Sequence, residues 1–158
     1  MKKITVFICA AALACSMSFP AFAAQTKKEY NTETAQVRQE LADTSASIKN
    51  LQKSSRTASD AAKTVRQCWK DSGQLKEHKD TWNQVRELKD DITEVQVSYT
   101  EASGQARLLK AQAKNDVKDG KYDEAIAKLN QCLEQKKKAL SSMEQINGIW
   151  AQIDSLLK

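Results

Sequence analysis

The residues of this sequence that are best suited to chemistry lie close together, in the segment VRQCWKDSGQLKEHKDTW from Val65 to Trp82. This segment contains the only histidine of the chain, His78, together with Cys68 and Trp69. A structural zinc site needs four cysteine or histidine ligands, and a catalytic zinc needs three protein ligands. One histidine and no CxxC pair do not supply such a set, so we expect no metal site.

Motifs for catalysis and cofactor binding are missing as well. The sequence has no CxxCH motif for a c-type haem. It also has no phosphate-binding loop and no recognisable nucleophile paired with a base. The carboxylates are spread over the faces of the expected helices. We therefore expect a protein that is not an enzyme and that binds no cofactor.

Long helices are expected to position these residues. After residue 23 the sequence contains no proline and only four glycines, and residues that favour helix are abundant. Seam residues recur at alternating spacings of four and three, as in coiled coils. The three stripes run from Tyr30 to Trp69, from Leu88 to Ala113 and from Tyr122 to Leu157. This pattern predicts an all-α fold, an elongated antiparallel three-helix bundle of up-down-up order with coiled-coil-like seams.

Two glycines divide the chain into helices. Gly73 and Gly120 can adopt the left-handed conformation that commonly ends a helix. We therefore predict helices over residues 27–71, 74–118 and 121–157, with short connections that make neighbours antiparallel. Residues 54–57, Ser-Ser-Arg-Thr, are poor helix formers. A break there would give four helices instead of three.

The predicted hairpin keeps Cys68 and Cys132 apart. Residues of its two helices pair when their numbers sum to about 239, so Cys132 lies level with residue 107 and Cys68 level with about residue 77. These levels are roughly 45 Å apart, whereas a disulfide needs Cα atoms within about 7 Å. We therefore expect no bond between Cys68 and Cys132 within one chain, unless the second helix folds back. Free thiols or an intermolecular bond are the alternatives. Met143 lies roughly 27 Å from His78 by the same count, too far for a pair of haem ligands.

The three tryptophans are expected to gather at one end of the rod. Trp150 lies near the level of residue 89, and Trp69 and Trp82 flank the turn at Gly73. They could close that end of the core, because tryptophan buries a large area. They could also form a recognition surface, because tryptophan is enriched in binding hot spots. Trp69, Trp82 and Trp150 are therefore the candidate interaction end.

Some stripe positions carry polar residues. Thr34, Thr44, Ser55 and Lys136 are expected to lie at partly exposed edges of a three-helix core, or alternatively against another subunit. The run from Lys136 to Lys138 is expected to be a solvated helix face.

The first residues have the features of an export signal. Lys2 and Lys3 precede an apolar stretch, and Ala21-Phe22-Ala23 offers small residues at a cleavage site. We expect cleavage before Ala24, which removes residues 1–23 and leaves residues 24–158 as a single helical-bundle domain. The alternative is a lipoprotein, because Ala12-Leu13-Ala14-Cys15 is similar to a lipobox in which Cys15 would be lipidated.

Cleavage would also change the charge. Two of the 25 basic residues lie before Ala24 and none of the 20 acidic ones does, so the net charge of +5 would fall to +3. Such a mixed, weakly basic chain is not typical of nucleic-acid-binding proteins. No segment of the mature chain is apolar enough to span a bilayer.

Part of the sequence resembles known helical families. Gly120-Lys121-Tyr122-Asp123-Glu124-Ala125-Ile126, followed by Leu129 and Cys132, resembles the second half of a tetratricopeptide repeat. The resemblance covers about residues 107–137 and departs at Gln112 and Asp116, where that family favours apolar or aromatic residues. With one partial unit, a solenoid is not expected. The segment KYDEAIAKLNQCLEQKKKAL is also similar to the C-terminal helix of FadA-type hairpin adhesins.

These observations favour an exported, non-enzymatic helical bundle that acts through protein–protein contacts. It would serve as an envelope adaptor, adhesin or structural element, in the periplasm or outside the cell, and as an outer-membrane lipoprotein if Cys15 is lipidated. The alternative is a periplasmic chaperone-like protein that holds apolar client segments on a basic helical surface. The expected partner is a protein or a second copy of the chain, and not a nucleic acid.

Overall fold

The computed structural model describes residue 24 and residues 26–158. The helices are α1 (Lys27–Glu33), α2 (Ala35–Asp71), the 3₁₀ helix η1 (Gln74–Lys76), α3 (Lys79–Lys118) and α4 (Tyr122–Leu156). No strand occurs among these described residues. The all-α helical bundle predicted from the sequence is therefore confirmed.

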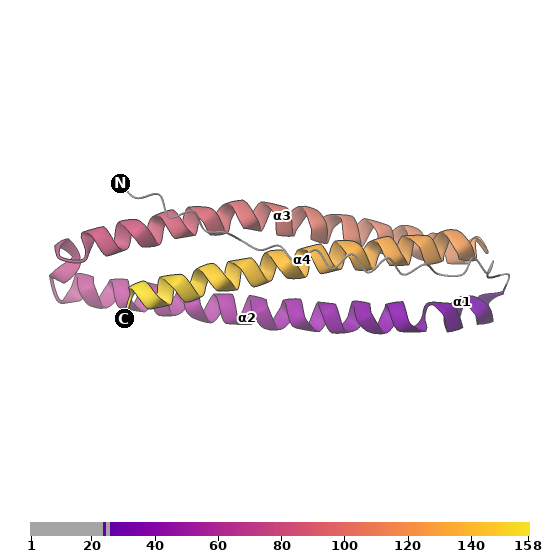
Figure 1. The fold of residues 1–158 in the computed structure, drawn as a ribbon, viewed down its shortest axis with the longest axis horizontal. Helices are drawn as coiled ribbons and strands as arrows, with labels where there is room; N and C mark the ends of the chain where they lie inside the picture. Colours follow the sequence, from indigo (N-terminus) through magenta and orange to yellow (C-terminus); the bar gives the residue numbers. More distant parts are fainter. Residues whose placement is uncertain (1–23, 25) are drawn as a thin grey trace.

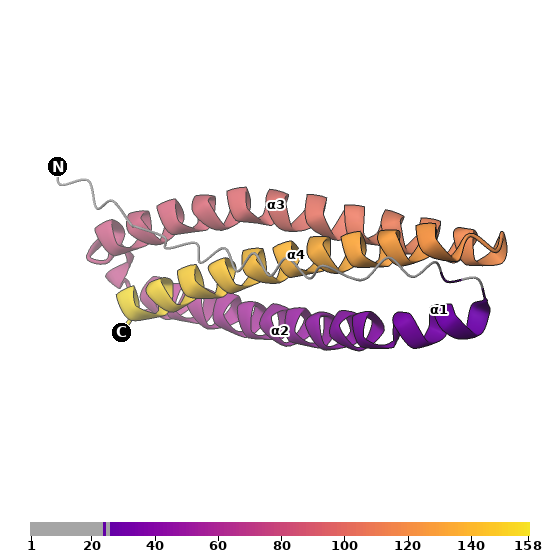
Figure 2. The same ribbon diagram turned by 45° about the vertical axis from the view of Figure 1, so that its right-hand side comes forward.

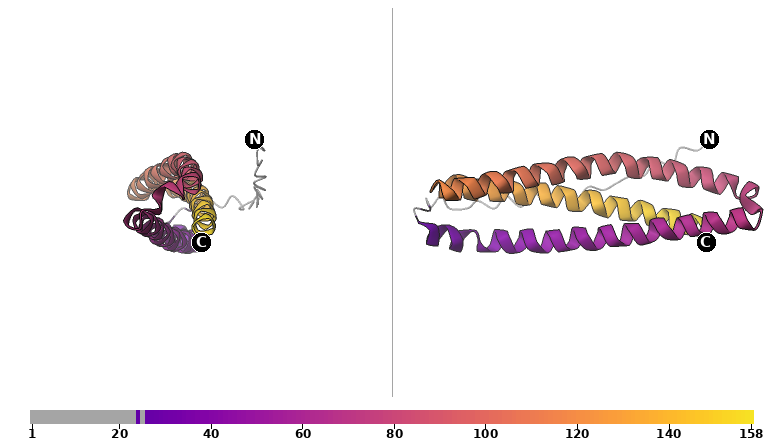
Figure 3. Two further views of the ribbon diagram at one scale, coloured as in Figure 1. Left: turned by 90° about the vertical axis from the view of Figure 1, so that its left-hand side faces the viewer. Right: turned by 180° about the vertical axis from the view of Figure 1, so that it is seen from behind.

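The three long helices lie side by side in an elongated rod (Figure 1). α3 runs antiparallel to α2, and α4 returns along both of them in the direction of α2 (Figures 1 and 2). Seen from its end, the bundle is triangular (Figure 3). α4 packs along both α3 and α2, whereas α2 and α3 barely approach each other. The backbones of α2 and α3 therefore stand apart, and side chains such as Gln52 and Tyr99 bridge this side of the bundle in places.

The turns fall at the predicted glycines. Gly73 has a φ of 76° and Gly120 a φ of 74°, values that residues with a side chain rarely adopt. The predicted start of the second long helix at residue 74 is wrong. Residues Gln74–Lys76 form a 3₁₀ turn after Gly73, and α3 begins only at Lys79.

The first helix is interrupted at Thr34. The alternative break near residues 54–57 does not occur, because α2 runs through them without interruption. Thr34 is fully buried, and its hydroxyl donates a hydrogen bond of 2.7 Å to the carbonyl oxygen of Tyr30. Threonine side chains that bond back to the preceding turn tend to bend a helix. Thr34 thus marks the bend between α1 and α2 (Figure 1).

The predicted stripes form two buried clusters. We call the first the tyrosine end; its members are Ala24, Tyr30, Val37, Leu41, Ala106, Ala113, Ala125, Leu129, Cys132 and Leu133. We call the second the tryptophan end; its members are Ile48, Ala62, Val85, Ala102, Ala139, Met143, Ile146, Trp150 and Ile153. Both clusters draw on α2, α3 and α4, so the core extends along the whole rod.

The expected export signal in residues 1–23, with Cys15, lies outside the described residues. Within the part that is described, none of the helices combines the length and apolar character that crossing a membrane requires.

Candidate binding groove

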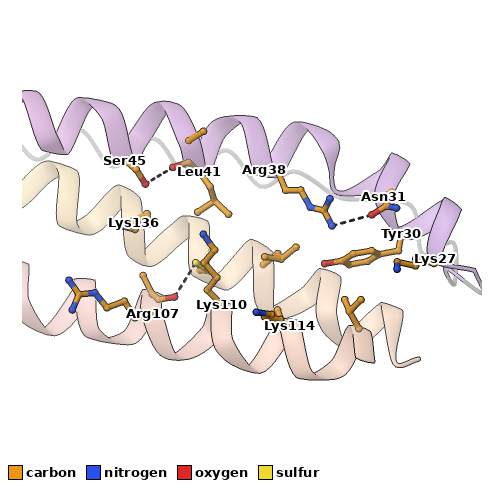
Figure 4. A pocket seen from close by; sticks show the side chains of 16 residues that line it. Lys27, Tyr30, Asn31, Arg38, Leu41, Ser45, Arg107, Lys110, Lys114 and Lys136 are labelled. Atoms are coloured by element: carbon orange, nitrogen blue, oxygen red, sulfur yellow. Dashed lines mark hydrogen bonds between the residues drawn. The ribbon is translucent and has the colours of Figure 1, made fainter. Parts of the chain in front are cut away.

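A groove of about 720 Å³ opens between α1–α2 and α3 at the tyrosine end (Figure 4). It exists because α4 holds α2 and α3 apart. α4 supplies the residues between the two walls. The volume lies within the range of roughly 300–1,000 Å³ that is typical of binding pockets.

The floor of the groove is apolar. It includes the buried residues Leu41, Ala106, Ala113, Leu129 and Cys132. Alanine fills little space, so Ala106 and Ala113 let α3 pack closely on α4 but leave the gap toward α2 unfilled. These five residues are each at most 8% exposed, so an apolar segment in the groove would gain mainly by covering more exposed lining atoms, such as Ala42 and the aliphatic parts of the lysine and arginine side chains.

The polar residues around this floor are strongly one-sided in charge. Among the described residues, six cationic side chains and no carboxylate line the groove; the cations are Lys27, Arg38, Arg107, Lys110, Lys114 and Lys136. The salt bridges formed among the described residues use four other lysines, namely Lys63, Lys128, Lys137 and Lys158. The groove therefore presents positive charge that no salt bridge of the described residues neutralises.

The cations lie along both sides of the groove. Arg107, Lys110 and Lys114 are spaced by three and four residues, which places them along one edge of α3. Arg38 extends from α2 on the opposite side (Figure 4). Its guanidinium donates to Oδ1 of Asn31 at 3.3 Å and lies 5.0 Å from the centre of the Tyr30 ring. These two contacts hold Arg38 at the edge of the apolar floor.

Cys132 lies in the floor and is 1% exposed. Its Sγ donates to the carbonyl oxygen of Ala106 at 3.2 Å, which confirms the register predicted for the hairpin of α3 and α4. Burial raises the pKa of the Cys132 thiol, and the positive charges of Lys110 and Lys136 oppose this only in part. The thiolate is therefore disfavoured at neutral pH, and Cys132 acts as a packing residue and not as a nucleophile.

Lys136 agrees with one of its two sequence interpretations and contradicts the other. It is half-buried and lines the groove, as expected for a partly exposed edge of the core and not for a solvated lysine face. Lys137 and Lys138 are exposed, as expected. Nζ of Lys137 donates to Oε2 of Glu40 at 3.0 Å, and this bond lowers the pKa of Glu40.

Two of the other polar stripe positions are more buried than expected. Thr34 is fully buried and Thr44 is 8% exposed, so the prediction of partly exposed edges is wrong for both. Ser55 is half-buried, as expected, and its Oγ accepts a hydrogen bond of 2.9 Å from Nδ2 of Asn147 on α4. The hydroxyls of Thr34 and Ser55 both have hydrogen-bond partners, which allows these polar residues in the seam.

At the tryptophan end, only part of the predicted set of Trp69, Trp82 and Trp150 comes together at one corner. The ring of Trp69 stacks on His78, with centroids 4.1 Å apart, and meets Trp82 edge-on at 6.4 Å. The guanidinium of Arg66 lies 4.9 Å from the centre of the Trp82 ring. Trp150 is buried in the core cluster, against which Trp82 also packs. Trp69 and Trp82 thus form a half-buried aromatic corner with His78, while Trp150 lies deeper.

The cysteines and His78 do not converge. Both thiols are free, Cys68 being exposed on α2 and Cys132 buried on α4. The contact between Glu40 and Lys137 sets the register of α2 against α4 and places Cys132 roughly 50 Å from the level of Cys68. Among the described residues, no three histidine, cysteine or acidic side chains are grouped so that they could hold a metal ion.

The groove was not predicted from the sequence. Its signal was the spacing of Arg107, Lys110 and Lys114 beside the small residues Ala106 and Ala113. That pattern becomes informative only when it is known that α2 does not cover this face of α3.

Comparison of the chain with family models, with curated proteins and with solved structures finds no match. The groove is therefore the structural basis for the function proposed below.

Proposed function

We propose that this chain is an exported, non-enzymatic protein that binds another protein by holding one of its helices in the groove. The observation that supports this function is the groove between α2 and α3, which has an apolar floor and cationic sides. Amphipathic helices commonly bind by laying their apolar face into a groove of this kind. A helix bound there would lie where a four-helix bundle has its fourth member.

The groove supports two of the functions that the sequence left open, the envelope adaptor and the alternative chaperone-like protein, over an adhesin or a structural element. A chaperone-like protein or an adaptor needs a surface that accepts an apolar helical segment, and the groove offers one. An adhesin or a structural rod would use its outer surface. The half-buried rings of Trp69 and Trp82 are the best candidate for such a contact, so this remains the second function.

Export is part of the proposal and is supported by the first residues of the sequence. We expect the protein recovered from producing cells to begin at Ala24 and to occur in the periplasm or the medium. Intact mass and N-terminal sequencing of the fractions measure this. A lipid on Cys15 would instead place the protein in the membrane fraction, and a full-length protein inside the cell would contradict export.

Binding can be tested with a peptide of defined chemistry. The probe is a fluorescent amphipathic helix of about 18 residues, long enough to span the groove, with a leucine-rich face and uncharged glutamine flanks. Fluorescence anisotropy with residues 24–158 should show saturable binding. Ala42, which is exposed and lines the groove, is replaced in A42F to fill it with an aromatic ring.

The matched control is A127F. Ala127 is exposed on α4 and is not among the residues that line the groove. We expect A42F to weaken binding about tenfold or more, because a filled groove cannot bury the leucine face, and A127F to bind normally. The absence of saturable binding, or equal binding by the two variants, would refute the proposed function.

A further inference from the structure

Resting on the proposed function, we infer that the partner helix is acidic, with carboxylates on both flanks of its apolar face. The groove binds such a helix through two matched features. Its apolar floor accepts the leucine-type face, and its cationic sides pair with the flanks. Electrostatic matching of this kind selects among partners that share the same apolar face.

Charge complementarity supports this choice. The lining residues that the structure describes include six cations and no carboxylate, so a bound basic helix would meet like charges on both sides. An acidic helix would instead neutralise cations that none of the salt bridges among the described residues occupies. Like-charge juxtaposition at an interface is unfavourable and suppresses wrong partners.

The distribution of the cations favours a helix over an anionic lipid. Arg107 and Lys114 lie seven residues apart on α3, roughly 10 Å, and Arg38 lies on the other wall. A fatty acid or lysolipid carries its anionic group at one end and would leave most of these cations unpaired. Carboxylates spaced by three and four residues along a helix follow the same period as Arg107, Lys110 and Lys114.

The size of the groove sets the length of the partner. The lining residues of α3 extend from Ala106 to Val117, which corresponds to roughly 16 Å or three helical turns. The open side of the groove imposes no limit on what lies outside it. A helical segment of three to five turns within a larger protein therefore fits.

The experiment compares three peptides that share one leucine-rich face and differ only in flanking residues, which are glutamate, glutamine or lysine. The affinity of each for residues 24–158 is measured at low and at high salt. We expect the glutamate peptide to bind about tenfold more tightly than the glutamine peptide at low salt, and the lysine peptide to bind least. This advantage should shrink at high salt because exposed charges are screened.

Two variants with the same change in net charge locate the effect. The groove variant replaces Arg107, Lys110 and Lys114 with glutamine. The control variant replaces Lys79, Arg86 and Lys118, exposed residues of α3 that do not line the groove. Glutamine is compatible with helix, so both variants should keep their helical circular dichroism. The groove variant should lose the preference for the glutamate peptide, and the control should keep it.

Each contrary result has a separate meaning. If the glutamine peptide binds and A42F blocks it, but glutamate adds nothing, the inferred acidic partner is wrong and the proposed function stands. If no peptide binds, the proposed function itself fails. If a monomeric anionic lysolipid displaces the glutamate peptide and loses its own binding in A42F, the occupant is a lipid. If light scattering shows a dimer that A42F dissociates, the occupant is a second copy. Either of these last two results overturns the inferred partner.

Discussion

The tyrosine end and the tryptophan end are built from the same three long helices, but the space between α2 and α3 is filled differently in each. At the tryptophan end, the core includes Val85, Trp150 and Ile153. The pocket beside Trp150 measures about 290 Å³ and has one cation, Arg56. At the tyrosine end, the groove measures about 720 Å³ and has six cations.

This contrast shows how an open site can form within a continuous bundle. Within the tryptophan end, Nε2 of Gln52 donates to Oη of Tyr99 at 2.7 Å and joins α2 to α3. Toward the tyrosine end, the residues of α3 that face the gap include Ala106 and Ala113, which cannot bridge it. The size of the side chains therefore decides where the bundle stays open, and their charge decides what the opening can hold.

The largest difference between the ends should appear when core side chains are truncated. Ile153 is 1% exposed inside the tryptophan end, so I153A should lower the free energy of unfolding by about 4 kcal/mol through lost burial and a new cavity. Leu41 borders the open groove, so L41A should cost only about 2 kcal/mol. Denaturant titration measures both values. Equal losses of unfolding free energy in I153A and L41A would contradict an open groove beside Leu41.

The two thiols should react at very different rates. Cys68 is exposed at the tryptophan end, whereas Cys132 is buried in the groove floor and burial raises its thiol pKa. We expect iodoacetamide at neutral pH to alkylate Cys68 at least about tenfold faster, because Cys132 reacts only after local opening. Mass spectrometry of peptides over time measures the two rates. Similar alkylation rates for Cys68 and Cys132 in the folded protein, each divided by its rate in the denatured protein, would contradict this placement.

The amino group of Ala24 should stabilise the tyrosine end in a chain that begins at this residue. The backbone nitrogen of the 6%-exposed Ala24 donates to Oδ1 of Asp123 at 2.8 Å. In residues 24–158 this nitrogen is an ammonium group, and its charge strengthens the bond. D123N should therefore lower the free energy of unfolding by about 1 kcal/mol more in residues 24–158 than in a chain extended before Ala24. Thermal unfolding measures this, and an equal fall in melting temperature on D123N substitution in the two chains would argue against this contact.

The smallest effect is expected from the bond between Glu40 and Lys137. The lowered pKa of Glu40 means that the pair stabilises the folded state above the ordinary value of 4.5, and that this contribution disappears as the pH falls through the folded value. Both side chains are partly exposed, so E40Q should cost less than about 1 kcal/mol at pH 7. Its effect should shrink as the pH falls below 4.5. A larger loss of stability from E40Q at acidic pH than at pH 7 would contradict the lowered pKa of Glu40.

Much of the fold could be predicted because it depends on local rules. The stripe from Tyr30 to Trp69 repeats at heptad spacing, and Gly73 and Gly120 stop helices by their left-handed conformation. The bend at Thr34 was missed because it depends on one hydroxyl bonding to the preceding turn. Poor helix formers at residues 54–57 stay helical, since tertiary packing outweighs weak local preference.

The groove could not be predicted because it depends on the spacing of whole helices. A stripe shows that Ala106 and Ala113 face the core, but it does not show which neighbours cover them. Lys136 illustrates the same problem, because in sequence it belongs both to a seam and to a lysine run, and only the packing places it beside the groove.

The central claim is that an acidic helix binds between α2 and α3, and a spin label on the peptide tests it most directly. The glutamate peptide carries a nitroxide at its centre, and amide signals of isotope-labelled residues 24–158 are recorded by nuclear magnetic resonance before and after reduction of the label. We predict broadening of Leu41 on α2 and Lys110 on α3, on both walls of the groove, and unchanged signals at Trp69 and Trp82. Broadening centred on the tryptophan end, or on one wall alone, would contradict the claim.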